Sequence, residues 1–123
     1  MAKWTNDSAM DAACSYISTN YAQIYLCSQQ PANYTEASTT YALAGKTGIS
    51  SGTTGPADGD ASGRKITIDA VTSISVSASG TANHVAITST DALLAVTTCT
   101  DQALTTGNTA QTAAFDIEFL DPS

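Results

Sequence analysis

Residues 65–78, KITIDAVTSISVSA, alternate apolar and polar side chains with a period of two, and so do residues 84–89 (HVAITS) and 113–120 (AAFDIEFL). Branched apolar residues that alternate with Ser, Thr and charged residues are typical of β-strands with one buried face. Turn-forming residues separate these segments at intervals of about ten residues. The stretch 64–120 therefore predicts an antiparallel β-meander that closes as a sandwich or a barrel.

The stretch before the meander is rich in glycine. Residues 45–63, GKTGISSGTTGPADGDASG, hold six of the eight glycines of the chain. This composition predicts a long Gly-rich loop or a pair of loose turns, and loops of this length are usually functional or mobile. Residues 21–27 alternate again and predict a strand, whereas residues 41–44, YALA, fit either a short strand or a helical turn.

The first twenty residues predict an N-terminal arm followed by an α-helix. The apolar positions form one narrow stripe with the spacing i, i+3, i+4, i+7, made by Met10, Ala13, Cys14 and Ile17. Thr5 or Asn6 can cap this helix, and Asn20 can end it. We therefore expect residues 1–123 to form a single mostly β domain with one N-terminal α-helix, since two independent cores would be too small.

The charge balance is strongly acidic. The chain carries 4 Lys and Arg against 11 Asp and Glu, a net charge of −7, and Ser and Thr fill 34 of the 123 positions. Affinity for phosphate comes mainly from Lys and Arg, so we expect no nucleic-acid partner. No apolar run approaches the roughly 20 residues of a membrane span, and the start has no apolar core of a secretion signal. These features predict a soluble protein made in a cytoplasm.

Three cysteines, Cys14, Cys27 and Cys99, cannot all pair within one chain. None lies in a C-x-x-C spacing, and secreted disulfide scaffolds have denser, even sets. We expect buried free thiols that pack as small apolar residues. The alternative is one internal bridge or a bond between subunits.

Two patterns resemble parts of catalytic sites. Residues 48–52, GISSG, match the G-x-S-x-G pattern with Ser50 at its centre, but no strand–turn–helix context surrounds it. His84 is the only histidine, and its strand phase places it on the face away from the predicted core. Nothing positions partners for a triad or a His-based metal site, so we expect no enzyme and no catalytic residues.

The most specific short motif of the chain is formed mainly by acidic residues. The spacing D-x-D-x-S-G-x5-D matches the oxygen ligands of a calcium loop and is formed by Asp58, Asp60, Ser62 and Asp69. Lys65 stands where such loops carry a branched apolar residue, and no helix flanks the loop. A tight acidic turn before a strand explains the same residues. Calcium is thus a weak candidate ligand, and no other cofactor is predicted.

Aromatic residues gather early in the chain. Trp4 is predicted to anchor the helix entry or a neighbouring subunit. Tyrosine is enriched at protein interfaces, where the ring packs and the hydroxyl stays hydrogen-bonded. The interface candidates are therefore Trp4, Tyr16, Tyr21 and Tyr25, although packing of the helix on the sheet explains the tyrosines equally well.

Three segments of the chain are similar to small virion structural proteins of tailed bacteriophages: MAKWTNDSAMDAACSYI, DGDASGRKITIDAVTSISVSASGTANHVAI and TTCTDQALTTGNTAQTAAFDIEFLDPS. Among these, the chain resembles head decoration (capsid cement) proteins. The resemblance covers nearly the full length and implies no catalytic residues. It implies a virion location, assembly in the host cytoplasm, and binding to the outside of the head.

The resemblance further implies two partners, the major capsid protein and copies of this chain, arranged as a trimer that stabilises the shell through repeated weak contacts. In that setting the N-terminal segment 2–6 is expected to contact the capsid lattice or a neighbouring copy. Two alternatives remain, a tail or neck component and a calcium-dependent surface- or carbohydrate-binding β-module.

Overall fold

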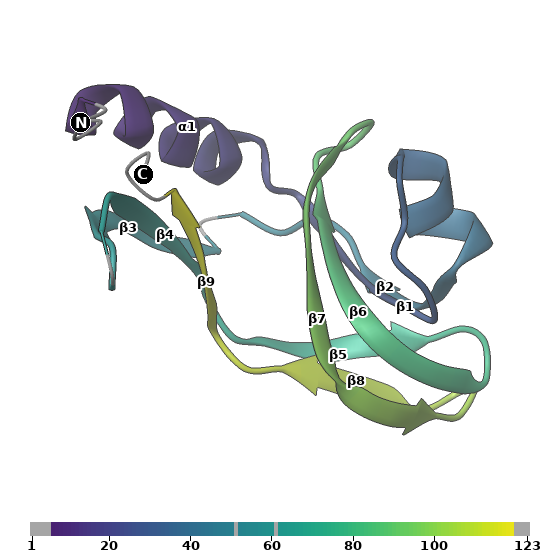
Figure 1. The fold of residues 1–123 in the computed structure, drawn as a ribbon. Helices are drawn as coiled ribbons and strands as arrows, with labels where there is room; N and C mark the ends of the chain where they lie inside the picture. Colours follow the sequence, from purple (N-terminus) through teal and green to yellow (C-terminus); the bar gives the residue numbers. More distant parts are fainter. Residues whose placement is uncertain (1–5, 51, 61, 120–123) are drawn as a thin grey trace. The chain divides into compact units, whose positions relative to one another are not determined.

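The computed structural model describes residues 6–50, 52–60 and 62–119 (Figure 1). The chain divides into two compact units. The small unit holds the described residues of Met1–Thr19, Ser51–Ala70 and Ala113–Ser123, and the large unit holds Asn20–Ser50 and Val71–Thr112. Each unit is thus built from segments that are discontinuous in sequence, and the chain passes between the units four times.

The predicted N-terminal helix is confirmed as α1 (Asp7–Asn20). Asn6 caps it, because its side-chain Oδ1 accepts a hydrogen bond of 2.7 Å from the backbone N–H of Ser8. The stripe is buried at Met10, Cys14 and Ile17. The arm before the helix, residues 1–5, lies outside the described residues.

The small unit contains a three-stranded antiparallel sheet with the order β3-β4-β9, formed by β3 (Thr53–Asp58), β4 (Arg64–Ile68) and β9 (Phe115–Phe119). Ile66 lies opposite Ile117, and Ile68 lies opposite Phe115, so one face is apolar. Arg64 lies on the same face and reaches Asp11 of α1. This face is therefore directed towards the helix, as the alternation of both strands predicts.

The prediction of a continuous loop over residues 45–63 is wrong in part, because β3 lies within it and the last two residues of β2 begin it. The register of β3 against β4 shifts between Thr54 and Ala57, where Gly55 and Pro56 stand. Proline is tolerated at edge strands and bulges, and β3 is an edge strand. Pairing with β4 therefore overrides the loop-like composition.

The large unit contains a six-stranded antiparallel sheet with the order β7-β6-β1-β2-β5-β8, which curves into a half-barrel. Its strands are β1 (Gln23–Cys27), β2 (Ala42–Lys46), β5 (Val71–Val76), β6 (Gly80–Thr88), β7 (Leu93–Leu104) and β8 (Thr109–Thr112). Residues 41–44, for which the sequence left two alternatives, thus lead into a strand. Most of the buried apolar side chains of the described chain belong to this sheet.

Opposite residues define the two faces of the large sheet. One row runs across all six strands and consists of Val96, Ala86, Tyr25, Gly45, Ser75 and Thr109. The neighbouring row points to the other face and includes Leu26, Val85, Ala44 and Val76, all of them buried. The apolar core of the large unit therefore lies on the second face.

A short π-helix, η1 (Glu36–Thr40), packs on the first face. Its Ala37 is fully buried and forms a cluster with Cys27 and Ala86. Asn33 Oδ1 accepts a hydrogen bond from the Glu36 N–H at 2.9 Å, and Glu36 Oε1 accepts one from the Ala32 N–H at 2.8 Å. This reciprocal pairing of side chains with backbone N–H groups holds the start of the helical segment.

In the described part of the chain, β7 is an edge strand that pairs only with β6. Ala82 pairs with Gln102 whereas His84 pairs with Thr98, so β7 carries extra residues between these pairs. A second shift lies beside Thr88, which pairs with Leu93. Two bulges therefore interrupt the edge strand and leave two short regular stretches, residues 95–98 and 102–104.

The predicted fold class, mostly β and antiparallel with one N-terminal α-helix, is confirmed. The strand order is less simple than a continuous meander, because residues 64–120 contribute strands to both sheets. Within that stretch, among the residues that the structure describes, only β6 and β7 pair with their neighbour in sequence. No helix in residues 6–50, 52–60 and 62–119 has the length and apolar character needed to cross a bilayer.

Candidate functional site

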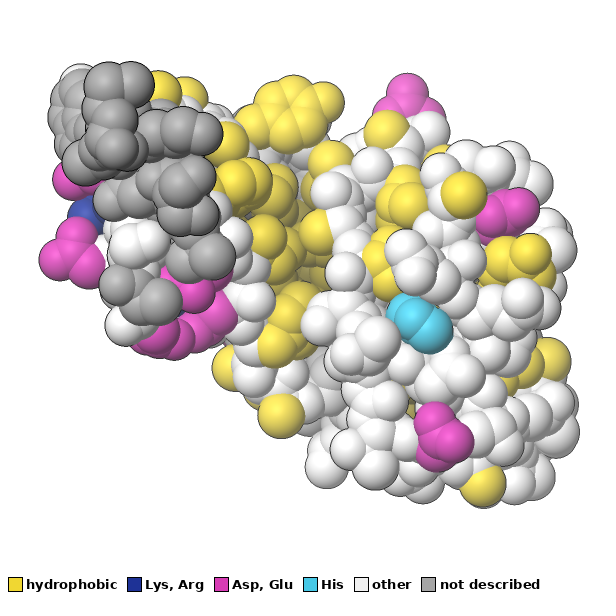
Figure 2. Space-filling view, in the orientation of Figure 1, with side chains coloured by type: hydrophobic (Ala, Val, Ile, Leu, Met, Phe, Trp, Pro, Cys, Tyr) yellow, Lys and Arg dark blue, Asp and Glu magenta, His cyan; other side chains and the backbone are white. Residues whose placement is uncertain are grey.

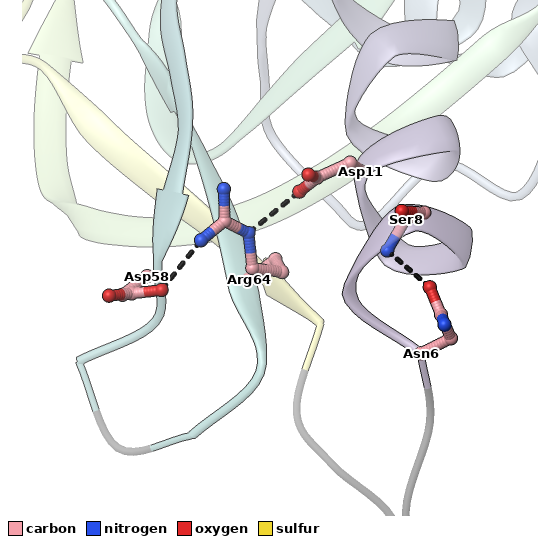
Figure 3. Close-up of polar contacts among 5 residues, drawn as sticks. All are labelled: Asn6, Ser8, Asp11, Asp58 and Arg64. Carbon is pink, nitrogen blue, oxygen red and sulfur yellow. Dashed lines mark hydrogen bonds and ion pairs between the residues drawn. The ribbon is translucent and has the colours of Figure 1, made fainter.

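Arg64 holds α1 and β3 together in the small unit (Figure 3). Its Nε donates to Asp11 Oδ1 of α1 at 2.7 Å, and a terminal guanidinium nitrogen donates to Asp58 Oδ1 of β3 at 2.6 Å. The hydrogen bond to Asp11, followed by that to Asp58, raises the pKa of Arg64. Asp58 is 90% exposed, so this second ion pair contributes little to stability.

The neighbouring cation, Lys65, lies on the opposite face of β4. Its Nζ donates to Asp60 Oδ1 at 2.7 Å and to Asp116 Oδ2 of β9 at 3.1 Å. The other oxygen of Asp116 accepts a hydrogen bond of 2.7 Å from Thr67 Oγ1. The hydroxyl of Thr67 and then the Lys65 ammonium lower the pKa of Asp116, because both stabilise its ionised form.

Asp116→Asn is expected to destabilise the protein at pH 7, and this difference is expected to shrink as the pH falls below about 4. The lowered pKa in the folded state means that ionised Asp116 contributes stability above its ordinary pKa. That contribution is lost as the pH falls through the folded pKa. Melting temperatures of both proteins from pH 7 to pH 3 measure the effect, with the exposed Asp101→Asn on β7 as the control. A difference that is constant with pH would contradict it.

The four candidate calcium ligands do not converge. Asp58 pairs with Arg64, Asp60 with Lys65, and Asp69 accepts a hydrogen bond of 2.7 Å from Thr54 Oγ1. Asp69 follows the last residue of β4 whereas Asp58 pairs with its first, and a strand of that length spans roughly 16 Å. Ser62 has a polar partner of its own. The described residues contain no group of three His, Cys, Asp or Glu side chains that is placed to bind a metal.

Calcium is therefore expected to leave the melting temperature unchanged. The carboxylates of the 58–69 pattern already bind Arg64, Lys65 and Thr54 of the protein itself. A calcium ion would therefore find no preformed set of ligands. Thermal melts in millimolar Ca²⁺, in Mg²⁺ and in chelator measure this, because a ligand of the folded state must raise its stability. A rise specific to Ca²⁺ that Asp60→Asn abolishes would show that the loop rearranges around the ion.

The interface candidates lie in different environments. Trp4 lies outside the described residues. Tyr16 of α1 is 61% exposed and is the one large apolar side chain in the described chain that is exposed. Tyr21, at the start of the large unit, is only 4% exposed. Of the tyrosines named from the sequence, Tyr16 is thus exposed, Tyr21 is buried and Tyr25 is half-buried.

Tyr25 belongs to a polar cluster that the sequence does not reveal. Gln23 Oε1 accepts hydrogen bonds from Tyr25 Oη at 2.6 Å and from Tyr34 Oη at 2.9 Å. Thr88 Oγ1 also donates to this oxygen, at 3.4 Å. Burial and the neighbouring Tyr34 raise the pKa of Tyr25 to about 12. The cluster fixes the Tyr25 ring across the sheet, which is a structural role.

Gly45→Ala is expected to destabilise the protein by about 1–3 kcal/mol, because the new methyl group would overlap the Tyr25 ring. A Cβ at Gly45 would lie 2.6 Å from the ring atoms Cδ1 and Cε1 of Tyr25. Urea unfolding measures the loss. In a Tyr25→Ala background the same substitution should cost less, and an unchanged cost in this double-mutant cycle would contradict the overlap.

Neither candidate catalytic residue has the geometry of a nucleophile site. Ser50 is exposed after β2, and the chain continues into β3 rather than into the helix that a nucleophile elbow needs. His84 is half-buried in β6, and its Nδ1 lies 2.5 Å from Asn83 Oδ1. It lies opposite Cys27 and Thr98, on the face away from the apolar core, as its phase predicts.

All three cysteines are free. Cys14 and Cys27 are fully buried, as expected, and burial raises the pKa of Cys27 to about 11. The expectation of a buried Cys99 is wrong, because the thiol lies exposed in the irregular part of β7. The alternation with a period of two could not predict this exposure, because it does not distinguish a central strand from a bulged edge strand.

Hydroxyl groups occupy many of the exposed positions of the outer strands of the large unit, by which we mean β5, β7 and β8; the other exposed positions carry Cys99, Asp101, Gln102, Ala103 and Gln111. We call this group the hydroxyl set; it consists of Thr72, Ser73 and Ser75 of β5, Thr98 and Thr100 of β7, and Thr109 of β8. Figure 2 shows a face of the large unit on which uncharged polar groups predominate and charged side chains are scattered. Such a surface supplies hydrogen-bond donors and acceptors without a strong electrostatic field.

Neither a protein-family model, nor a curated protein, nor a solved structure matches this chain. The functional assignment therefore depends on the residues themselves.

Proposed function

We propose that this chain is a structural protein of a tailed-bacteriophage virion, a decoration protein that binds the outside of the head and stabilises it without catalysis. The observation that carries the proposal is the hydroxyl set on the outer strands of the large unit. Hydroxyl groups on ordered strands form many weak, uncharged contacts, and weak contacts repeated over a lattice add up to strong attachment. The three sequence segments that resemble virion proteins support the same assignment.

The charge of the chain supports an exterior position. A net charge of −7 disfavours contact with a packaged genome. Arg64 and Lys65, the two adjacent cations of β4, are each engaged by two aspartates of the small unit. They are therefore committed to intramolecular ion pairs rather than to phosphate groups.

The proposed partners are the major capsid protein and further copies of this chain, arranged as a trimer. The experiment is to add the purified chain to heads of the phage that encodes it, prepared without this protein. Co-sedimentation gives the number of bound copies, and cryo-electron microscopy gives their position. We expect binding to the head exterior and heads that survive higher temperature. Density at the neck or tail, or no binding, would overturn the proposal.

A truncation tests the role of the N-terminal segment within this proposal. Removing residues 1–5 retains Asn6, so the cap of α1 remains. We expect a lower number of bound copies with an unchanged melting temperature. Trp4→Ala should reproduce part of the loss, and Ser15→Ala at an exposed position of α1 is the control. Unchanged occupancy after the truncation would exclude this segment as the contact.

A further inference from the structure

We infer that the small unit opens while the large unit stays folded, and that the reverse order does not occur. The inference depends on how the chain is divided between the units. The large unit interrupts the small unit twice, through Asn20–Ser50 and Val71–Thr112. The small unit interrupts the large unit once, through Ser51–Ala70.

The entropy of loop closure makes this division asymmetric. If the large unit unfolded alone, the small unit would have to hold two long disordered loops closed. If the small unit unfolded alone, the large unit would hold one shorter loop closed, and both chain ends would be free. Each disordered loop of this length that the folded unit must hold closed lowers the population of the partly unfolded state by a factor on the order of 100. The large unit therefore tolerates opening of the small unit far better than the reverse.

The distribution of buried side chains points in the same direction. Among the described residues, the buried apolar side chains of the small unit are Met10, Cys14, Ile17, Ile66 and Ile68, whereas the large unit holds three times as many. Of its ion pairs between elements, the one from Lys65 of β4 to Asp116 of β9 is exposed, and exposed pairs contribute little. A unit with few buried contacts opens at low cost.

Opening of this kind would release α1 and β9 together. These elements lie near the two ends of the chain, in Met1–Thr19 and Ala113–Ser123. The large sheet, with all six of its strands, would remain intact. The protein would then have a folded body and two reversibly detachable end segments.

Native-state hydrogen exchange on the full chain, with matched substitutions, tests the order of opening. Ile24 in β1 and Ile66 in β4 are both fully buried, and Ile→Val removes the same methyl group from each. In the unsubstituted protein we expect amides of β4 and β9 to be less protected than those of β1 and β6. Ile24→Val should lower protection by about 2- to 13-fold in β1 and β6 and leave β4 and β9 unchanged.

Ile66→Val should lower protection in both units by one common factor, because the open small unit is part of every larger opening. Two other patterns would overturn the inference. If Ile24→Val lowers protection in both units, the chain opens as one cooperative unit. If Ile66→Val lowers protection in β4 and β9 alone, the large unit opens while the small unit stays folded.

Discussion

Ile24→Ala is expected to lower the free energy of unfolding by about 2–5 kcal/mol. Ile24 is fully buried in β1, the strand between β2 and β6 in the six-stranded sheet. It lies opposite Ile87 of β6, which is also buried. Truncation to Ala removes apolar contacts and leaves a cavity that a sheet paired on both sides cannot close. Urea unfolding followed by far-ultraviolet circular dichroism measures the loss.

Two further variants test whether the loss of stability is specific to the buried side chain. Ile24→Val keeps most of the side chain and should cost about 0.5–1.5 kcal/mol. Thr72→Ala, at an exposed position of β5 in the same unit, should change stability by less than about 0.5 kcal/mol. If Ile24→Ala costs no more than Thr72→Ala, the described face of the large sheet is not its core.

Ile66→Ala is expected to cost a similar amount, about 2–5 kcal/mol, but to act on the small unit. Ile66 is fully buried in β4 and lies opposite Ile117, on the face directed towards α1. Trypsin reports the effect directly, because Arg64 and Lys65 are two of only four Lys and Arg residues in the chain. Opening of the small unit exposes both bonds, so cleavage there should accelerate by about 30-fold or more.

The position of the cut provides the control. Lys46 is in β2 of the large unit, which opens only after the small unit, so cleavage after it should stay slower than cleavage after Arg64 and Lys65 in every variant. Ile66→Val should give an intermediate rate. Cleavage after Lys46 at the same rate as cleavage at β4 would show that the whole chain opens at once.

Local patterns in the sequence were sufficient for the elements with strong periodicity. The stripe of Met10, Cys14 and Ile17 predicts α1, and the alternation over residues 65–78 predicts β4 and β5. These signals are local, since a helix or a strand face is defined by neighbours three, four or two residues away. The fold class follows from them.

Pairing between distant strands was not predictable in the same way. β3 lies in a Gly-rich segment that reads as a loop, and only its register against β4 makes it a strand. The assignment of β4 and β9 to one sheet and of β5 to another depends on contacts between distant residues, which alternation does not encode. η1 had one usable signal, an Asn followed three residues later by Glu36, which resembles a capping box.

The candidate site was predicted less well than the fold. The acidic residues have the spacing of a calcium loop, but β4 separates Asp58 from Asp69. Asp58 and Asp60 instead form ion pairs with the cations of β4. The cluster around Gln23 was missed because its partners, Tyr34 and Thr88, come from distant segments. Exposure of Ser73 and Ser75, by contrast, follows from their alternation with Ile74 and Val76, whereas exposure of the threonines in the hydroxyl set does not follow from such an alternation.

The two bulges of β7 have a consequence for behaviour at high concentration. A straight edge of twelve residues would template the addition of strands from other molecules and could grow into fibres. The irregular pairing at Thr88 and between Ala82 and His84 divides this edge into two short regular stretches, residues 95–98 and 102–104. Crowded copies of this protein should accordingly not polymerise through the β7 edge.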